Sequence, residues 1–159
     1  ALEIMAEEGL EYDSSMFPTS LHAYGMPSSP LHPRRIRLKT GQSIVEFPAQ
    51  LLSLGSLKIP AAGGFYLRAF PTMLSVWALR QSERAGESGM VYLHPYDLDA
   101  DVPRLKVPFV FRVIRYYNLA STFGRLRMLM SKFQFSSIQQ LMVSSRYSVV
   151  AAATIGGKQ

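Results

Sequence analysis

Length is the property that most restricts how this chain can fold. Its 159 residues are enough for one domain, but a closed barrel of strand–helix units takes at least about 200 residues, since each unit takes about 30. A helical pattern is already under way in residues 1–8, which are strong helix formers and precede Gly9. We therefore expect a chain cut from a longer α/β protein.

Charge is divided unevenly along the chain. Residues 1–101 contain all 11 acidic residues and 8 of the 17 Lys and Arg residues, whereas residues 102–159 contain nine basic residues and no acidic one. The basic residues of the second segment alternate with Leu, Met and Phe, which predicts a solvated helix face rather than a nucleic-acid or lipid contact. We expect no nucleic-acid partner. We also expect no transmembrane segment, because no run of 18 apolar residues occurs.

Residues 10–60 contain strand and turn signals. Residues 10–15 alternate briefly and predict a short strand. Four prolines interrupt residues 17–34, which predicts a long surface loop. Residues 35–39 and 43–47 flank a Thr-Gly-Gln turn and predict a β-hairpin. Residues 51–59 are apolar around a central glycine and match no single element.

Residues 61–93 predict a helix followed by a strand. Pro71 suits the first turn of a helix over residues 71–85. Residues 90–93 form a compact apolar run that predicts a buried strand. The predicted inner face of the helix consists of Leu74, Trp77, Ala78 and the stem of Gln81.

Helical patterns return in the basic segment. Residues 109–133 predict a helix in two pieces, broken near Asn118 to Gly124. In the second piece we expect an apolar packing stripe with the basic residues mostly outside it: Phe123, Leu126, Met130 and Phe133. We divide the chain into a first part (1–101), a basic helical extension (102–143) and a poorly ordered tail (144–159).

His94 is the residue that most clearly predicts chemistry. It follows the predicted strand 90–93, and side chains at the C-terminal ends of strands face the site in α/β sheets and barrels. Histidine is also the side chain that titrates near neutral pH. His94 is therefore a candidate general acid or base. The alternative is a strand-end histidine that only hydrogen-bonds a backbone carbonyl.

Three further residues are candidate site residues. Asp13 ends the other predicted strand, where a carboxylate could orient His94, although it could equally form a local turn with the serines that follow it. Tyr66 and Arg68 follow a Gly-Gly pair that would let a ligand approach the backbone, and they could supply a ring and a polar clamp for a sugar. The alternative for the glycine pair is a bulge or tight turn.

Five segments, in order, resemble the C-terminal half of bacterial polysaccharide deacetylases of the NodB type. In particular they resemble the subgroup associated with exopolysaccharide and exosortase gene clusters, which has a C-terminal extension. The segments are residues 2–17 (LEIMAEEGLEYDSSMF), 46–48 (EFP), 60–68 (PAAGGFYLR), 91–99 (VYLHPYDLD) and 116–126 (YYNLASTFGRL).

The resemblance implies part of a distorted (β/α) barrel that removes N-acetyl groups from the amino sugars of a polysaccharide. By motif, His94 matches a late-strand acid that protonates the departing amine, and Asp13 matches a position that tunes this histidine. Tyr66 and Arg68 match a segment beside the substrate groove. Tyr96-Asp97 stand where Trp-Glu is usual.

The resemblance also implies a divalent metal, usually zinc, in the full-length parent. The Asp, the two His and the catalytic base that hold and use it belong to motifs upstream of Ala1. The three histidines here are well separated, so we expect this fragment to bind no metal and to be inactive alone. The alternatives are a non-catalytic carbohydrate-binding or scaffold module, and a basic adaptor whose C-terminal segment binds an anionic surface or nucleic acid.

Overall fold

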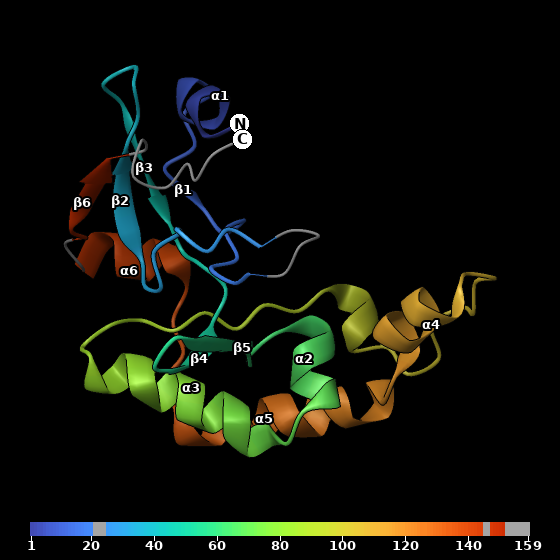
Figure 1. The fold of residues 1–159 in the computed structure, drawn as a ribbon. Helices are drawn as coiled ribbons and strands as arrows, with labels where there is room; N and C mark the ends of the chain where they lie inside the picture. The colour runs from blue at the N-terminus through green and yellow to red at the C-terminus, as the bar shows by residue number, and fades with distance from the viewer. Residues whose placement is uncertain (21–24, 145–146, 152–159) are drawn as a thin grey trace.

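The computed structural model describes residues 1–20, 25–144 and 147–151, which fold into a sheet layer and a helical layer (Figure 1). The sheet has the order β1-β3-β2-β6, and its bounds are Tyr12–Asp13, Ser43–Glu46, Arg34–Arg37 and Val149–Ala151. Strands β2 and β3 are antiparallel, whereas β1 pairs with β3, and β6 with β2, in parallel. The predicted β2–β3 hairpin and the short strand β1 are thus confirmed.

Helix α1 (Leu2–Glu7) covers one face of this sheet. It ends at Gly9, whose φ of 81° is easily adopted only by glycine. Between the helix and the sheet lies a cluster of buried apolar side chains: Ala6, Met16, Ile36, Leu38 and Ile44. The helix predicted for residues 1–8 is therefore confirmed, together with its glycine stop.

A second hairpin lies in the segment that the sequence left unassigned. Strands β4 (Leu51–Leu54) and β5 (Leu57–Pro60) are antiparallel, and Gly55 has a φ of 60° in the turn between them. Helix α3 (Thr72–Arg84) packs against this hairpin. The helix predicted over residues 71–85 is therefore confirmed. It forms here because a proline suits its N-terminus and one of its faces is suited to burial.

The predicted inner face of α3 is wrong at its largest residue. Trp77 is 55% exposed, whereas Val76 and Leu79 are buried. The small Ser75, Ala78 and Ser82 are also buried, because they allow the helix backbone to lie close to the hairpin. Close packing against β4 therefore selects small side chains rather than the largest ring.

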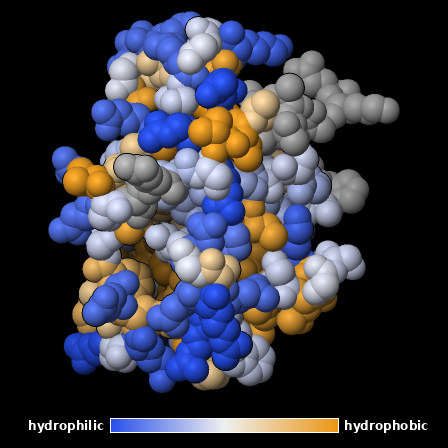
Figure 2. All heavy atoms as spheres, turned by 90° about the vertical axis from the view of Figure 1, so that its left-hand side faces the viewer, coloured by the Kyte–Doolittle hydropathy of each residue, from blue (hydrophilic) through white to orange (hydrophobic). Residues whose placement is uncertain are grey.

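The helical layer is closed by α2 (Gly64–Ala69) and α5 (Thr122–Lys132), which pack on one another and on α3. Their shared core is a cluster of buried apolar residues: Leu67, Val76, Leu79 and Leu129. The extension after residue 101 is therefore joined to the first part through common packing. Figure 2 shows one side of the molecule, where hydrophilic side chains dominate and apolar ones lie in patches between them.

Helix α4 (Phe109–Tyr116) and α5 are the two predicted helical pieces, separated at Asn118, whose φ is 51°. The predicted packing stripe of α5 is wrong at Phe123 and Met130, which are 59% and 57% exposed, whereas Phe133 packs on the buried cluster as predicted. Its inner face instead includes Arg125, whose guanidinium donates to the Leu67 carbonyl at 2.8 Å and to the Phe70 carbonyl. A charged side chain lies inward here because it satisfies the carbonyls at the end of α2.

Two more sequence predictions differ from the structure. Residues 90–93 make one β-bridge, between Tyr92 and Gly63, instead of a strand, because α2 begins at Gly64 and ends the pairing. Within the predicted poorly ordered tail, β6 forms against β2, and it follows helix α6 (Ile138–Ser144). Residues 145–146 and 152–159 lie outside the described part.

The described residues thus form a mixed α/β fold with an open, mixed sheet rather than a closed barrel. None of the described helices has the length and apolar character needed to cross a membrane.

Candidate functional site: an aromatic cleft

A cleft of about 470 Å³ lies between α2, the segment around His94, and α4. Two of its walls come from positions far apart in the chain, because the Gly63–Tyr92 bridge holds the start of α2 beside the segment that ends at His94. Rings and polar groups line it together: Phe65, Tyr66, Arg68, Tyr92, His94, Tyr96, Asp97, Phe111 and Arg115, with Gly64, Leu105, Val107 and Ile114. Such a mixture is typical of a small-molecule or sugar site.

His94 lies exposed at this cleft. Its ring stacks on Tyr96, with centroids 5.1 Å apart and planes at 16°, and it meets the edge of Tyr92 at 6.2 Å. The guanidinium of Arg115 lies over the other ring of this stack, 4.8 Å from the Tyr96 centroid. The imidazole is therefore oriented by aromatic neighbours and accessible to a ligand, as a general acid must be.

A buried ion pair supports the His94 segment from below. Nη2 of Arg68 lies 2.8 Å from Oδ1 of Asp97, and both side chains are 1% exposed. Oδ2 of Asp97 accepts the backbone N–H of His94 at 3.0 Å. The carboxylate thereby fixes the backbone of the residue that carries the candidate acid.

Arg68 is bonded within the protein by every nitrogen of its guanidinium. Nε donates to the Gly64 carbonyl, and Nη1 and Nη2 donate to carbonyls at the end of α4: Ile114, Arg115 and Tyr117. Burial lowers the pKa of Arg68 from its usual value, and the charge of Asp97 opposes this shift. The predicted polar clamp on a sugar is thus engaged internally, and Arg68 holds α2, α4 and the His94 segment together.

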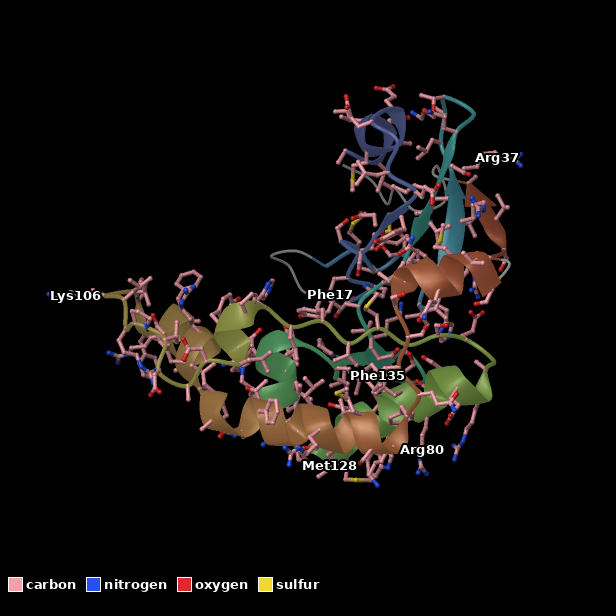
Figure 3. The ribbon with its side chains drawn as sticks, turned by 180° about the vertical axis from the view of Figure 1, so that it is seen from behind. Phe17, Arg37, Arg80, Lys106, Met128 and Phe135 are labelled. Atoms are coloured by element: carbon pink, nitrogen blue, oxygen red, sulfur yellow. The ribbon has the colours of Figure 1, made fainter. Side chains whose placement is uncertain are left out.

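Tyr66 lies in the cleft wall, as predicted, and is itself packed by aromatic residues. Its ring stacks on Phe17 at 6.0 Å and on Phe70 at 6.3 Å. Phe17 follows β1 and lies between the sheet and α2 (Figure 3). The cleft is therefore connected to the sheet layer through this ring.

Asp13 is not among the residues of the cleft. It lies on β1 opposite Glu46 of β3, and the Ser15 hydroxyl donates to its Oδ2, in line with the local alternative. Glu46 is fully buried, and the N–H of Met16 donates to its Oε1 at 2.8 Å. Burial raises the pKa of Glu46 to about 7, and the nearby charge of Asp13 adds to this rise. Glu46 therefore holds its proton over a range of pH in which an exposed glutamate has lost it.

The structure also offers a larger hollow of about 820 Å³, between the ends of α3 and α5. Its wall contains no histidine and fewer rings, so we place the candidate site in the smaller cleft. Within the described residues, no three His, Asp or Glu side chains gather as a metal site would require.

Asp97 is a site residue that sequence reasoning missed, and Glu46 is a buried carboxyl group outside the cleft that it also missed. Glu46 lies in a predicted strand, and the residues around it in the sequence do not show that its side chain points into the core. Asp97 belongs to the quoted His-Pro-Tyr-Asp motif, so the signal was present. Its spacing of three residues from His94 is that of a helix-capping carboxylate, which the His94 N–H contact confirms.

A protein family described as "Domain of unknown function (DUF3473)" matches residues 14–143. This stretch includes the whole cleft and most of both layers. No curated protein and no solved structure matches the chain.

Proposed function

The chain belongs to the DUF3473 family, and from the site that this domain contains we propose that it forms the C-terminal part of a metal-dependent polysaccharide deacetylase. One observation carries the proposal: His94 and Tyr66 come from separate segments and meet in one aromatic cleft. The sequence motifs that contain both residues are those that resemble NodB-type enzymes.

In this proposal His94 is the general acid. Hydrolysis of an N-acetyl group ends when the C–N bond breaks, and the departing amine must then gain a proton. An exposed imidazolium N–H in the cleft can donate that proton and accept it back from solvent. The Tyr96 ring beneath His94 and the Asp97 carboxylate on its backbone N–H fix the direction of the donation.

The cleft wall supplies the sugar contacts. Phe111 is 63% exposed and offers a flat apolar face, which is the surface that the C–H face of a pyranose packs against. Because Tyr66 is packed on Phe17 and Phe70, we expect its edge and hydroxyl to meet the glycan. Arg68 acts as a positioning residue. Asp13 lies outside the cleft and makes no contact with the substrate in this proposal.

The resemblance implies a divalent metal that activates the attacking water when it is bound. The described residues do not bring together three side chains to hold such an ion, and we assign it no ligand in this chain. On the resemblance, we propose that another half of the protein holds the metal and that the described sheet is part of a distorted NodB-type barrel. We expect the 159-residue chain alone to be inactive, because water that no metal ion activates is a weak nucleophile.

The test of catalysis uses the longer protein that the proposal requires. Replacing His94 by Ala should lower the deacetylation rate about 10²–10⁴-fold, the usual contribution of a positioned acid or base. Replacing His32, a histidine outside the cleft, by Ala should leave the rate unchanged. If the His94→Ala rate stays within a factor of two of wild type, His94 is not the acid.

A non-catalytic glycan-binding module is the second candidate, because the ring-lined cleft alone could bind a sugar. The two candidates differ in what they require of His94. Binding that is retained in His94→Ala, in a protein without any deacetylase activity, favours the binding module.

A further inference from the structure

The segment that precedes α4 and the first turn of this helix expose apolar side chains to solvent. Phe109 and Val110 are 68% and 63% exposed, and Leu105 is 54% exposed. Val113 and Tyr116 turn toward the protein instead. Transfer of the Phe109 and Val110 side chains from water to an apolar environment would therefore be favourable.

Basic side chains surround this apolar group. Arg104, Lys106 and Arg112 are all exposed, and the guanidinium of Arg112 lies 5.5 Å from the centroid of the Phe109 ring. The sequence contains no acidic residue from position 102 onward. We call Arg104, Leu105, Lys106, Phe109, Val110 and Arg112 the α4 tip.

The α4 tip projects from the molecule. Figure 1 shows α4 at the end of the helical layer, away from the sheet and from α1. Figure 3 shows Lys106 at the outermost point of this end, directed away from the rest of the chain. A convex projection of this kind can insert into a deformable surface that has no groove of matching shape.

We propose that the α4 tip docks on the surface of an anionic lipid bilayer. Phe109, Val110 and Leu105 would enter the interface, and the three cations would meet the negative headgroups, as in other interfacial helices. α4 has eight residues, which suits a contact with the surface rather than a span. This proposal does not depend on the proposed function.

The chemistry of the tip favours a bilayer over the other occupants. A second copy that met the tip with its own α4 tip would bring three cations against three cations, because the six residues of the tip include no acidic one. A nucleic acid would accept the cations but gain nothing from Phe109 and Val110. An anionic bilayer satisfies both kinds of side chain.

Docking would also place the cleft beside the membrane. Leu105 belongs to the tip and to the cleft wall, and Phe111 and Ile114 of the cleft lie on α4, the helix that carries the tip. A ligand of the cleft would then be met at the membrane surface.

The first experiment is co-sedimentation of the 159-residue chain with vesicles. We expect binding to vesicles of equal parts phosphatidylglycerol and phosphatidylcholine, little binding to phosphatidylcholine alone, and weaker binding as salt rises. Arg104→Gln with Lys106→Gln should weaken binding about 25-fold, since each basic residue near such a surface contributes about fivefold. Phe109→Ser with Val110→Ser should abolish it.

Trp77→Ser is the matched control, because Trp77 is a similarly exposed ring on α3; this variant should bind as wild type. A second measurement uses a variant that should still bind. In Trp77→Phe with Phe109→Trp, the only tryptophan is at the tip, and its fluorescence emission should shift to shorter wavelength when the vesicles of mixed phosphatidylglycerol and phosphatidylcholine are added. An unshifted emission, equal binding by all variants, or a dimer that the Phe109→Ser/Val110→Ser change dissociates would overturn the proposal. Preferential binding to nucleic acid would do so as well.

Discussion

Replacing Asp97 by Ala is expected to destabilise the fold and to release the His94 segment at the same time. Asp97 is 1% exposed, with one carboxylate oxygen 2.8 Å from Arg68 and the other accepting the N–H of His94 at 3.0 Å. The substitution removes both contacts and leaves the Arg68 guanidinium buried. Its remaining partners are carbonyl oxygens, which carry only partial charge.

The size of the effect follows from the burial of this pair. Breaking a buried ion pair by removing one partner costs about 3–5 kcal/mol. The Arg68 carbonyl contacts keep part of the stabilisation, so we expect about 3 kcal/mol. For a chain of this size the urea m-value is about 2 kcal/mol/M, so the unfolding midpoint should fall by about 1.5 M.

Urea unfolding followed by circular dichroism measures this shift. Asp99→Ala is the matched control, because Asp99 is exposed two residues further along, and its midpoint should hardly change. The NMR signals of the His94 ring should move in Asp97→Ala and stay in Asp99→Ala. A loss below about 1 kcal/mol, the range of exposed ion pairs, would show that Asp97 and Arg68 are not a buried pair in solution, and the support proposed for His94 would fail.

Three further predictions concern the core and the cleft wall. Because the pKa of Glu46 is raised to about 7 in the fold, the protonated form favours folding, and stability should fall as pH rises from about 4.5 to 7. Glu46→Gln should therefore be more stable than wild type at pH 8, by up to about 3 kcal/mol, and nearly equal to it at pH 4; an equal gain at both pH values would contradict the raised pKa. Gly63→Ala would place a Cβ 2.2 Å from the Tyr92 ring, so thermal unfolding should show that the free energy of unfolding falls by about 3 kcal/mol or more. Gly124→Ala is the control, because its added Cβ meets nothing. An equal effect of the two substitutions would refute the close approach of Gly63 to Tyr92. Trp77→Ala should change the free energy of unfolding by about 0.5 kcal/mol or less, whereas Leu79→Ala should cost about 2–4 kcal/mol; the reverse order would show that α3 is rotated.

The sequence predicted elements whose signals are local. α1 and its stop at Gly9, the β2–β3 hairpin, α3 after its proline, and the break at Asn118 all follow from propensity, turn chemistry or periodicity within a few residues. The bridge at residues 90–93 was mistaken for a strand because an apolar run does not show how many partners it will find. The β4–β5 hairpin was missed because a central glycine in an apolar run suits several structures.

Facing and burial were harder to predict, because they depend on partners far along the chain. Apolar character placed Trp77 inside, whereas packing against β4 selects the small side chains of Ser75 and Ala78. Charge placed Arg125 outside, yet the carbonyls at the end of α2 draw its guanidinium inward. Glu46 is buried although it is acidic, because β3 lies between β1 and β2, an arrangement that the residues around Glu46 do not show.

The candidate site was predicted in part. The sequence identified His94 and Tyr66, and the structure places both in one cleft. The sequence also predicted that Arg68 is a polar clamp on a sugar. The structure instead shows Arg68 buried, paired with Asp97 and hydrogen-bonded to α4. A motif identifies which residues are close to a site, but only the structure shows which of them point into it and which hold it in place.

The most direct test of the proposed glycan site is an NMR titration of the 159-residue chain with an oligosaccharide of N-acetylglucosamine, followed at the histidine rings. We predict that the chemical shifts of the His94 ring change until the binding saturates, whereas those of His32 do not change. Phe111→Ala should weaken the binding about tenfold, because one ring contact is lost. Histidine signals that do not change at saturating sugar, or a shift at His32 alone, would contradict this prediction.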